Sequence, residues 1–188
     1  MELEEIKKIV QKTLSEKRFY HSVCVMNMCE DLAKKYKIDL ETAKKVGLVH
    51  DIAKEMDDVE KLNYVKKNNI EIDKVEENNL GLLHAKIGAD ISKKYFKFSD
   101  EMCKAIQIHT TAKENMTMLA KILYISDWCG EDRTFEEAKN TRKKLLDEGI
   151  DIAMLYTFNV IIKDQIEKNK EIHINTINAR NYLLGEMK

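Results

Sequence analysis

Proline is absent from the 188 residues of this chain, and glycine occurs only six times. Proline removes a backbone donor and clashes with the preceding helical turn, and glycine weakens a helix interior by about 1 kcal/mol relative to alanine. A chain with so few helix breakers is expected to be all-α. Its length suits one domain, large enough to bury a sizeable core.

An excess of charge of either sign is also missing. Lys and Arg total 32 and Asp and Glu total 33, which leaves a net charge of −1. Domains that bind nucleic acid usually carry a basic excess, so no nucleic-acid partner is expected. The four cysteines form no CxxC pair and no zinc-finger spacing, so we expect reduced thiols at Cys24, Cys29, Cys103 and Cys129.

Long hydrophobic runs are equally scarce. The longest late uncharged run, Ile152 to Ile162, is far shorter than the roughly 20 residues that cross a bilayer. The first five residues, Met1 to Glu5, lack the basic start and apolar stretch of a signal peptide. We therefore expect a cytoplasmic protein with no membrane partner.

Apolar residues recur at helical spacing through most of the chain. Helices are predicted over Arg18 to Tyr36, Ala43 to Ala53, Leu83 to Tyr95, Met102 to His109, Leu119 to Asp127, Ile150 to Ile166 and Thr176 to Leu184. Breaks are predicted at 37–39, 68–79, 97–100 and 110–115, and segment 68–79 is either an irregular loop or a short helix. Asp39, Ser99 and Asn175 are expected helix N-caps. The pattern predicts one compact helical bundle over 1–188, with a core of about 15–140 and C-terminal helices of 150–185 packed on it.

Four of the five histidines fall on apolar helix faces, together with two aspartates. In chain order the set is His21, His50-Asp51, His84, His109 and Asp127. One such histidine is usually a hydrogen-bonded core residue, but buried polar groups without partners cost on the order of 1–3 kcal/mol each. A shared cation satisfies all of them, since imidazoles are neutral ligands and carboxylates can bridge cations. The set therefore predicts a metal-dependent hydrolase rather than a structural protein with buried histidines.

A ligand scheme follows from this order. Asp51 directly follows His50, about 100° further round a helix, so both can reach one cation from different angles. His21, His50, Asp51 and Asp127 are the expected ligands of the principal ion. If Asp51 bridges, His84 and His109 hold a second ion; otherwise these two contact phosphate. A two-metal site lowers the pKa of a bridging water and clamps a phosphoryl group. The donors suit iron, manganese or cobalt better than calcium, with zinc as a further alternative.

The order His21…His50-Asp51…Asp127 resembles the HD-domain metal-dependent phosphohydrolase superfamily. The finer pattern is similar to the YqeK family of bis(5′-nucleosyl)-tetraphosphatases (symmetrical) and spans about residues 15 to 185. It is carried by Arg18-Phe19-Tyr20-His21-Ser22, Gly47 to Lys54, Leu83-His84 with Gly88-Ala89, Ala105-Ile106 with His109-Thr110-Thr111, Met116, Tyr124 to Asp127 with Arg133, and Ile172-His173 with Thr176 and Ala179-Arg180-Asn181. The resemblance implies an all-α HD-type bundle that hydrolyses diadenosine tetraphosphate to two ADP, with iron as the metal.

Three positions depart from the family pattern, and none removes a ligand. Ala112 stands where a glycine commonly follows the His-Thr-Thr run, and Ile174 where a proline often follows the tail histidine. Trp128 to Asp132 replaces a lysine-containing, Glu-Pro stretch before Arg133. This third departure concerns the substrate contacts beside the metal.

Positive side chains accompany the proposed ligands. Arg18 lies three residues before His21, on nearly the same helical face. A guanidinium fork suits phosphate oxygens, so Arg18 and Arg133 are expected to bind phosphate, with a solvated or helix-pairing arginine as the alternative. Lys54 is expected to neutralise a phosphate or leaving group; without the resemblance it would be read as a surface lysine. Asp51, Lys54 and Arg133 are thus the expected catalytic residues.

Further substrate contacts are expected around these groups. Thr110 offers a hydroxyl or a backbone N–H to a phosphate. His173 lies on no apolar stripe, and by resemblance the tail from His173 to Asn181 closes over the nucleotide. Trp128 either stacks on a base or packs between helices.

Alternative functions stay open at this point. One is an HD-type phosphatase acting on nucleoside monophosphates or another phosphorylated metabolite. Another is a regulatory protein that binds metal and nucleotide without turnover. The expected partner for the leading function is a small nucleotide, diadenosine tetraphosphate with ADP as product, and a homodimer is a further option.

Overall fold

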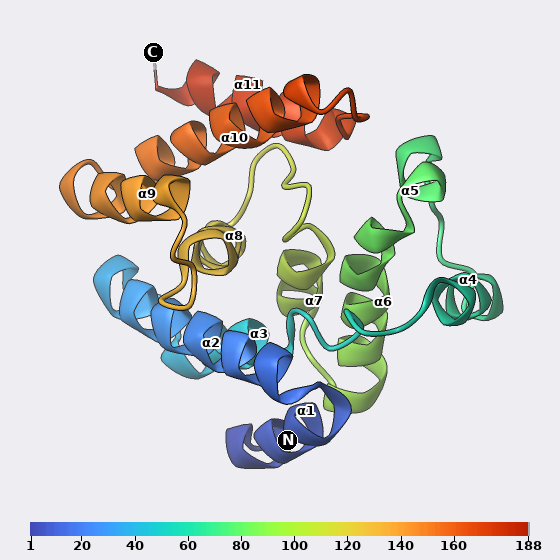
Figure 1. Ribbon diagram of the computed structural model, residues 1–188. Helices are drawn as coiled ribbons and strands as arrows, with labels where there is room; N and C mark the ends of the chain where they lie inside the picture. Colours follow the sequence, from blue (N-terminus) through green and yellow to red (C-terminus); the bar gives the residue numbers. More distant parts are fainter. Residues whose placement is uncertain (188) are drawn as a thin grey trace.

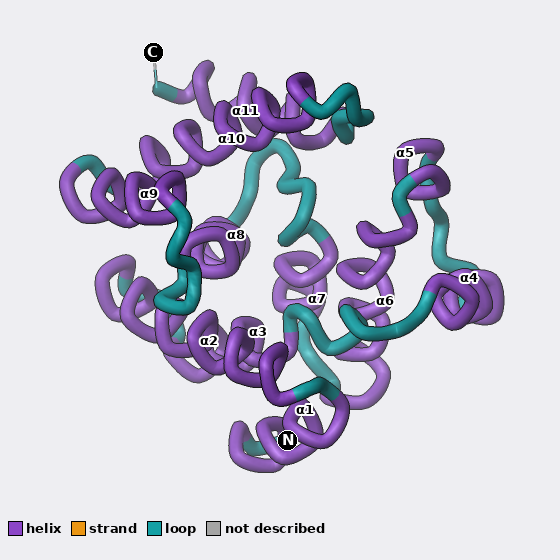
Figure 2. Tube along the Cα trace, in the orientation of Figure 1, coloured by secondary structure: helices purple, strands orange, loops and turns teal. Residues whose placement is uncertain are grey.

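The computed structural model describes residues 1–187, and in this part of the chain all regular secondary structure is helical, with loops between the helices and no strand (Figure 2). The predicted all-α fold is confirmed. The elements are α1 (Leu3–Thr13), α2 (Glu16–Tyr36), α3 (Leu40–Val49), α4 (Asp58–Lys67), α5 (Lys74–Asn78), the short 3₁₀ turn η1 (Leu80–Leu82), α6 (Leu83–Ile91), the π turn η2 (Ser92–Phe96), α7 (Asp100–Gln107), α8 (Met118–Cys129), α9 (Glu136–Asp147), α10 (Ile150–Glu167) and α11 (Ile174–Glu186).

The helices that carry the predicted ligands pack on one another. Helix α2 lies along α3 and also contacts α8, while α7 contacts α3, α6 and α8. Helices α10 and α11 lie together at the end of the molecule opposite α1, and α10 contacts α8 and α9 (Figure 1). The C-terminal pair thus reaches the ligand-bearing helices through α8.

Gly47 determines how closely α2 and α3 approach. A Cβ built on Gly47 would lie 2.9 Å from the Met26 Cα and 3.0 Å from the Cys29 Sγ. Only a residue without a side chain permits this separation, because real Cβ atoms essentially never come so near to backbone. The contact holds His21, on α2, beside His50 at the end of α3.

Helix boundaries match the sequence in part. Asp39 and Ser99 are confirmed as N-caps, since their side chains accept from the amides of Thr42 and Met102. The prediction of Asn175 is wrong: the cap of α11 is His173, whose Nδ1 accepts from the Asn175 amide. Segment 68–79 contains the short helix α5.

Three helices were not anticipated, namely α1, α4 and α9. Each buries few apolar side chains: Ile6 and Val10 in α1, Val65 in α4, and Ala138 and Leu145 in α9. Charged residues dominate the local sequence of all three helices, which hides these few apolar side chains although those of α1 lie on one face.

The cysteines are free, and Cys24, Cys29 and Cys129 are buried. Burial raises the pKa of the Cys29 thiol to about 12, which keeps it protonated and unreactive near neutral pH. The expectation of reduced structural thiols is confirmed.

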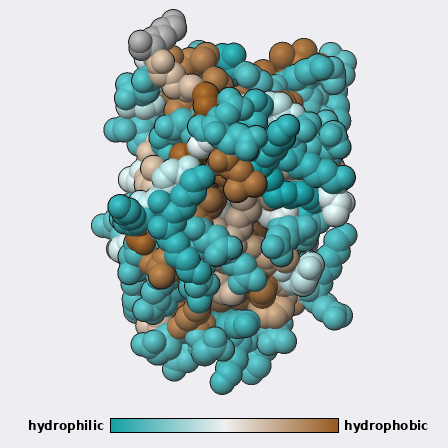
Figure 3. All heavy atoms as spheres, turned by 90° about the vertical axis from the view of Figure 1, so that its left-hand side faces the viewer, coloured by the Kyte–Doolittle hydropathy of each residue, from teal (hydrophilic) through white to brown (hydrophobic). Residues whose placement is uncertain are grey.

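The outer face seen from the α9 side is mostly hydrophilic, with hydrophobic groups between the polar side chains (Figure 3). Among residues 1–187, no helix combines the length and apolar character needed to cross a membrane.

Replacing Gly47 by alanine should destabilise the fold. The new methyl group must displace the α2 backbone near Met26, and overpacking of this kind costs about 1–3 kcal/mol in the free energy of unfolding. Gly185→Ala is the matched control, because that glycine is exposed in α11 and a Cβ added to it would meet no other atom within 4 Å. The control should leave stability unchanged or raise it by about 1 kcal/mol. Urea unfolding of both variants checks this, and equal stability of Gly47→Ala and the native chain would contradict it.

Candidate metal centre

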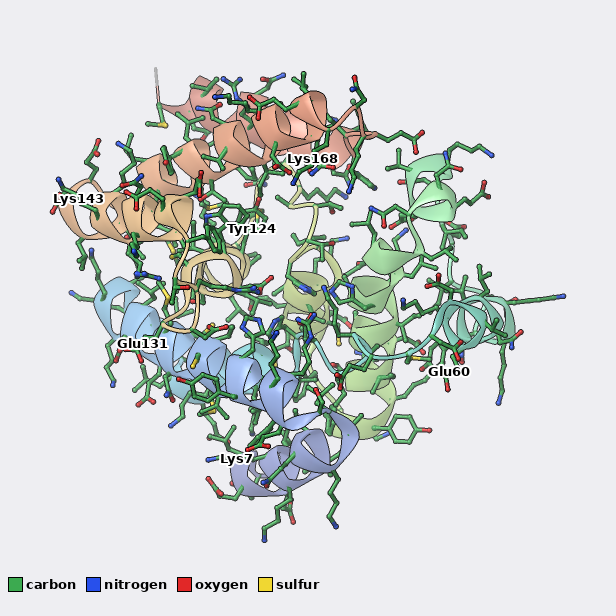
Figure 4. The ribbon with its side chains drawn as sticks, viewed as in Figure 1. Lys7, Glu60, Tyr124, Glu131, Lys143 and Lys168 are labelled. Atoms are coloured by element: carbon green, nitrogen blue, oxygen red, sulfur yellow. The ribbon has the colours of Figure 1, made fainter. Side chains whose placement is uncertain are left out.

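Six predicted side chains meet near the middle of the molecule. His21 and Asp127 project from α2 and α8, and His84 from the first turn of α6. His50 is the C-cap of α3 with Asp51 directly after it, and His109 follows the end of α7. Nitrogen-bearing rings gather at the centre between α2, α7 and α8 (Figure 4). The structure therefore brings the whole predicted ligand set together.

His50 and Asp51 do not lie in a regular helix, as the sequence had suggested. Helix α3 ends at Val49, and the chain continues in tight turns in which the Ile52 amide donates to the Val49 carbonyl and the Lys54 amide to that of Asp51. These three-residue turns wind more tightly than an α-helix. They place the Asp51 Oδ2 3.7 Å from the His50 Nε2.

Hydrogen bonds fix the orientation of three rings. Each ring donates its Nδ1–H to the backbone carbonyl three residues earlier. The pairs are His50 with Gly47 at 2.7 Å, His84 with Gly81 at 2.5 Å, and His109 with Ile106 at 2.7 Å. A neutral imidazole that donates from Nδ1 carries a lone pair on Nε2. All three Nε2 atoms are thus presented to the centre as acceptors.

Across this centre, hydrogen-bond acceptors of the imidazole rings and of the Asp51 carboxylate lie opposite one another. The Nε2 atoms of His84 and His109 are 3.1 Å apart. Asp51 Oδ1 lies 3.1 Å from the His84 Nε2 and 3.6 Å from the His109 Nε2. Two lone pairs at such distances repel unless a positive charge lies nearby, and the Lys54 Nζ, 3.2 Å from the His84 Nε2, supplies one.

Two acceptor atoms at the centre have no hydrogen-bond partner in the described residues. His50 Nε2 and Asp51 Oδ1 are buried and have no hydrogen-bond partner in the described part of the chain. An unpartnered buried acceptor costs about 1–3 kcal/mol. A cation coordinated by these atoms would remove the cost, so the donor set fits a metal ion.

Close approach defines two overlapping groups of ligand atoms. One comprises His21, His50 and Asp127, and the other His50, Asp51 and His109, each with its atoms within 4.8 Å of one another. His50 belongs to both groups. The sequence had paired His109 with His84, whereas here the ring of His109 also lies against that of His50, with centroids 5.1 Å apart.

Electrostatics set the protonation of the buried groups. Burial alone would lower the pKa of His50, but the carboxylates of Asp51 and Asp127 outweigh it and raise that pKa. Burial alone would raise the pKa of the Asp51 carboxyl, but His50, His109 and His84 outweigh it and hold that pKa well below its usual range. Burial lowers the pKa of His84 to about 4. Near neutral pH, Asp51 is therefore ionised and His84 neutral, as metal ligation requires.

Three positive side chains surround the carboxylates. Arg18 NH1 lies 3.5 Å from the Asp51 Oδ2, and the Lys54 Nζ lies 3.8 Å from the Asp51 Oδ1. Arg133 donates from NH2 to the Asp127 Oδ1 at 3.1 Å and from Nε to the Asp127 carbonyl at 3.2 Å. The predicted phosphate-binding residues thus stand around the predicted ligands.

A cavity of about 890 Å³ opens beside the centre. Thr110, His109 and Asp127 line its inner end, and α10 contributes Lys163 and Lys168. Its remaining lining includes the aromatic side chains of Tyr124, Trp128, Phe135 and Tyr156. Tyr124 lies on the α8 side and Lys168 on the α10 side (Figure 4). The volume is within the range of small-molecule sites.

The Tyr124 hydroxyl is buried without a hydrogen-bond partner among residues 1–187. The sequence did not single out this hydroxyl or the cavity's Phe135 and Tyr156. They are brought to the centre by the packing of α8 and α10, which no local pattern reveals.

His173 occupies a different place. Its Nε2 lies 2.7 Å from the Asp73 Oδ2, and its Nδ1 caps α11. Asp73, Glu76 and His173 form a third group of close ligand atoms. Asp73 also accepts from the Glu76 amide, and Glu76 from Lys86. These hydrogen bonds account for the group and tie the start of α11 to α5.

One contact of the centre was missed. Asp132 Oδ2 lies 2.8 Å from the His21 Nδ1. Asp132 falls in the stretch from Trp128 to Asp132, which departs from the family pattern. This departure was the signal in the sequence that could have pointed to the contact.

Comparisons with known proteins agree with this geometry. The model of the HD domain family matches residues 18–132. A protein from Halalkalibacterium halodurans named symmetrical bis(5′-nucleosyl)-tetraphosphatase is 31% identical, with 96% of each chain covered. A Bacillus subtilis protein of the same name is 27% identical over 98% of this chain and 99% of its own.

A solved structure gives the same result for the fold. The crystal structure of a Clostridium acetobutylicum protein, described as a predicted HD superfamily hydrolase involved in NAD metabolism, is 35% identical. It superposes with a TM-score of 0.93 over 99% of this chain and 98% of that chain. The chain therefore belongs to the HD domain family and, within it, to the group of full-length relatives named symmetrical bis(5′-nucleosyl)-tetraphosphatases.

Proposed function

We propose that this protein hydrolyses a phosphoanhydride in a nucleotide and that its reaction is the symmetrical cleavage of diadenosine tetraphosphate to two ADP. The observation that carries the proposal is the convergence of six candidate ligands beside a cavity of about 890 Å³, with His84 joined to the others through its contacts with His109 and Asp51. Full-length relatives named for this activity support the choice of substrate.

His21, His50, Asp51 and Asp127 are the proposed ligands of the principal ion, and His84 and His109, together with Asp51, would hold a second ion. Iron is the proposed metal, and manganese, cobalt and zinc are alternatives, since all accept imidazole nitrogen. When bound, such ions lower the pKa of coordinated water and neutralise charge on a phosphoryl group. Unpartnered acceptors at His50 and Asp51 support this assignment.

The protein's own cations bind and orient the polyphosphate. Arg18, Lys54 and Arg133 surround the carboxylates of Asp51 and Asp127 from three directions. Guanidinium groups suit phosphate oxygens, and an ammonium close to the centre stabilises charge on a departing phosphate. Thr110, on the cavity wall, offers a further donor.

The nucleoside ends of the substrate need apolar and aromatic surface. Phe135 and Tyr156 on the cavity wall can stack on a base, and the Tyr124 hydroxyl can bond to it or to a ribose. Trp128 serves mainly in packing, because its indole donates to Thr141 and its ring meets that of Phe135 edge-on. We also propose that His173 and the tail after it cover the bound nucleotide. The contact of His173 with Asp73 ties this tail to α5.

Location and assembly belong to the same proposal. We place the reaction in the cytoplasm, and the two assembly states to compare are a monomer and a homodimer, which light scattering of the purified protein would distinguish.

Asp51→Ala should lose metal, because it removes the carboxylate proposed to bridge. Metal analysis of unchelated protein should find one or two transition-metal ions per native chain and a clear loss in the variant. Asp31→Ala, an exposed aspartate of α2, is the control and should keep the metal. Full turnover by Asp51→Ala in the presence of chelator would exclude the proposed centre.

His84→Ala distinguishes a two-ion from a one-ion site. Loss of a ligand of the second ion should leave about half of the native metal content and little activity. His173→Ala removes another buried imidazole outside the centre and should retain all the metal. Unchanged metal in His84→Ala with a raised KM would instead make His84 a phosphate contact.

Diadenosine tetraphosphate should yield ADP alone. Ion-exchange chromatography of the products measures this, and equal AMP and ATP would show asymmetric cleavage. Inorganic phosphate from a nucleoside monophosphate, with the dinucleotide intact, would favour a phosphatase. NAD belongs in the same panel because of the description of the Clostridium relative. Tight binding of nucleotide without turnover would indicate a regulatory protein.

Arg133→Ala should lower kcat/KM for that substrate by about 10- to 100-fold, which corresponds to one lost charge-assisted hydrogen bond of about 1.5–3 kcal/mol. Metal content should be unchanged, because Arg133 is not a ligand. Lys143→Ala, an exposed cation on α9 (Figure 4), controls for net charge. Native kinetics in Arg133→Ala would exclude the assigned role.

A further inference from the structure

The four histidines of the centre are oriented in two different ways. Three rings donate Nδ1–H to a backbone carbonyl, but His21 has a carboxylate, Asp132 Oδ2, at 2.8 Å from its Nδ1. The difference follows from where the rings lie. Carbonyls in the last turn of a helix have no amide partner within it, and His50 and His109 use such carbonyls. His21 lies in the interior of α2, where carbonyls bond to the helix's own amides.

Asp132 is held in place by its loop. The Arg133 amide donates to the Gly130 carbonyl at 2.9 Å. The Arg142 NH1 group donates to the carbonyls of Cys129, Gly130 and Arg133 at 2.9, 3.0 and 3.0 Å. The loop following α8 is therefore fixed to α9 by one guanidinium, and the Asp132 side chain is only 16% exposed.

Gly130 supplies the space that the Asp132 carboxylate fills. A Cβ on Gly130 would lie 3.0 Å from the Asp132 Oδ1. Its φ of −53° is accessible to any residue, so the glycine is needed for room rather than for backbone freedom. The Asp132 Oδ1 itself is buried without a hydrogen-bond partner in residues 1–187. The other oxygen, Oδ2, lies 2.8 Å from the His21 Nδ1 and 3.9 Å from the Arg133 Nε, so His21 is the nearer partner of this largely buried carboxylate.

We propose that Asp132 is a positioning residue of the metal centre, which orients His21 and strengthens its Nε2 as a metal ligand. The inference rests on the proposed metal-dependent function. With Nδ1–H directed to Asp132, the lone pair of Nε2 faces the Asp127 Oδ1 at 3.0 Å. A carboxylate behind a ligating histidine fixes its tautomer and increases its electron donation, and loss of such a partner weakens metal affinity about 10- to 100-fold.

The test compares Asp132→Ala and Asp132→Asn with Glu131→Gln. The asparagine keeps an oxygen that accepts from Nδ1–H but has no charge. Glu131 is the neighbouring exposed carboxylate (Figure 4) and controls for the loss of one negative charge. Competition with a chelator measures the Mn²⁺ affinity of each protein. Imidazole ¹⁵N NMR of the metal-free proteins reports which nitrogen of His21 carries the proton.

Asp132→Ala should bind Mn²⁺ about 10- to 100-fold more weakly, Asp132→Asn should be intermediate, and Glu131→Gln should equal the native chain. The His21 proton should stay on Nδ1 in the native and Asn proteins and divide between both nitrogens in the Ala protein. Gly130→Ala retains the carboxylate but displaces it, and should weaken Mn²⁺ binding as well.

Native Mn²⁺ affinity in Asp132→Ala, or an unchanged His21 tautomer there, would overturn the proposal. If even the native protein bound no metal, the proposed function would fail as well, and the NMR comparison would still show whether Asp132 orients the ring. Should the Ala variant not fold, the Asn variant decides, since native affinity in it would exclude a role for the charge.

Discussion

Repulsion between the lone pairs that meet at the centre is the physical constraint on which the rest of the structure depends. The Nδ1 atoms of the rings are directed outward to backbone carbonyls or to Asp132, which leaves acceptors at His84 and His109 3.1 Å apart. Such an arrangement is stable only with positive charge close by. Arg18, Lys54 and Arg133 supply part of it, and a divalent ion would supply the rest. The same charges that balance the ligands are therefore available to a polyphosphate.

Helix termini make this arrangement possible. A ring at the end of a helix can use a carbonyl of the last turn, which has no amide partner within the helix, so the Nδ1 atoms of His50 and His109 bond to backbone. The close contact at Gly47 then sets α2 beside α3, which brings His21 to the same point. His21 has no free carbonyl in its own helix, and the loop after α8 provides Asp132 instead. Backbone carbonyls and the Asp132 carboxylate, which belong to different elements, thus all orient imidazole rings through Nδ1.

The cavity beside the centre offers two kinds of surface. His109, Thr110 and Asp127 line it together with aromatic rings from α8, α10 and the loop before α9. Such a lining suits a ligand with both polar and apolar parts. The C-terminal helices take part because α10 packs on α8, so residues far from the His-Asp pair in sequence line the same space.

The sequence by itself determined the helical class, most helix positions and the six converging residues. Absence of proline, 3.6-residue periodicity and the unusual cost of burying four imidazoles are local or compositional signals. Only the tertiary structure decided how those residues are oriented, that His50 and Asp51 lie in a tight turn, and that Asp132 meets His21 across 111 positions of sequence. Contacts of this kind depend on how α2, α8 and the following loop pack together. Packing between distant segments leaves no periodic pattern in the sequence of either segment. The candidate ligands could therefore be predicted from the sequence, whereas the residues that orient them could not.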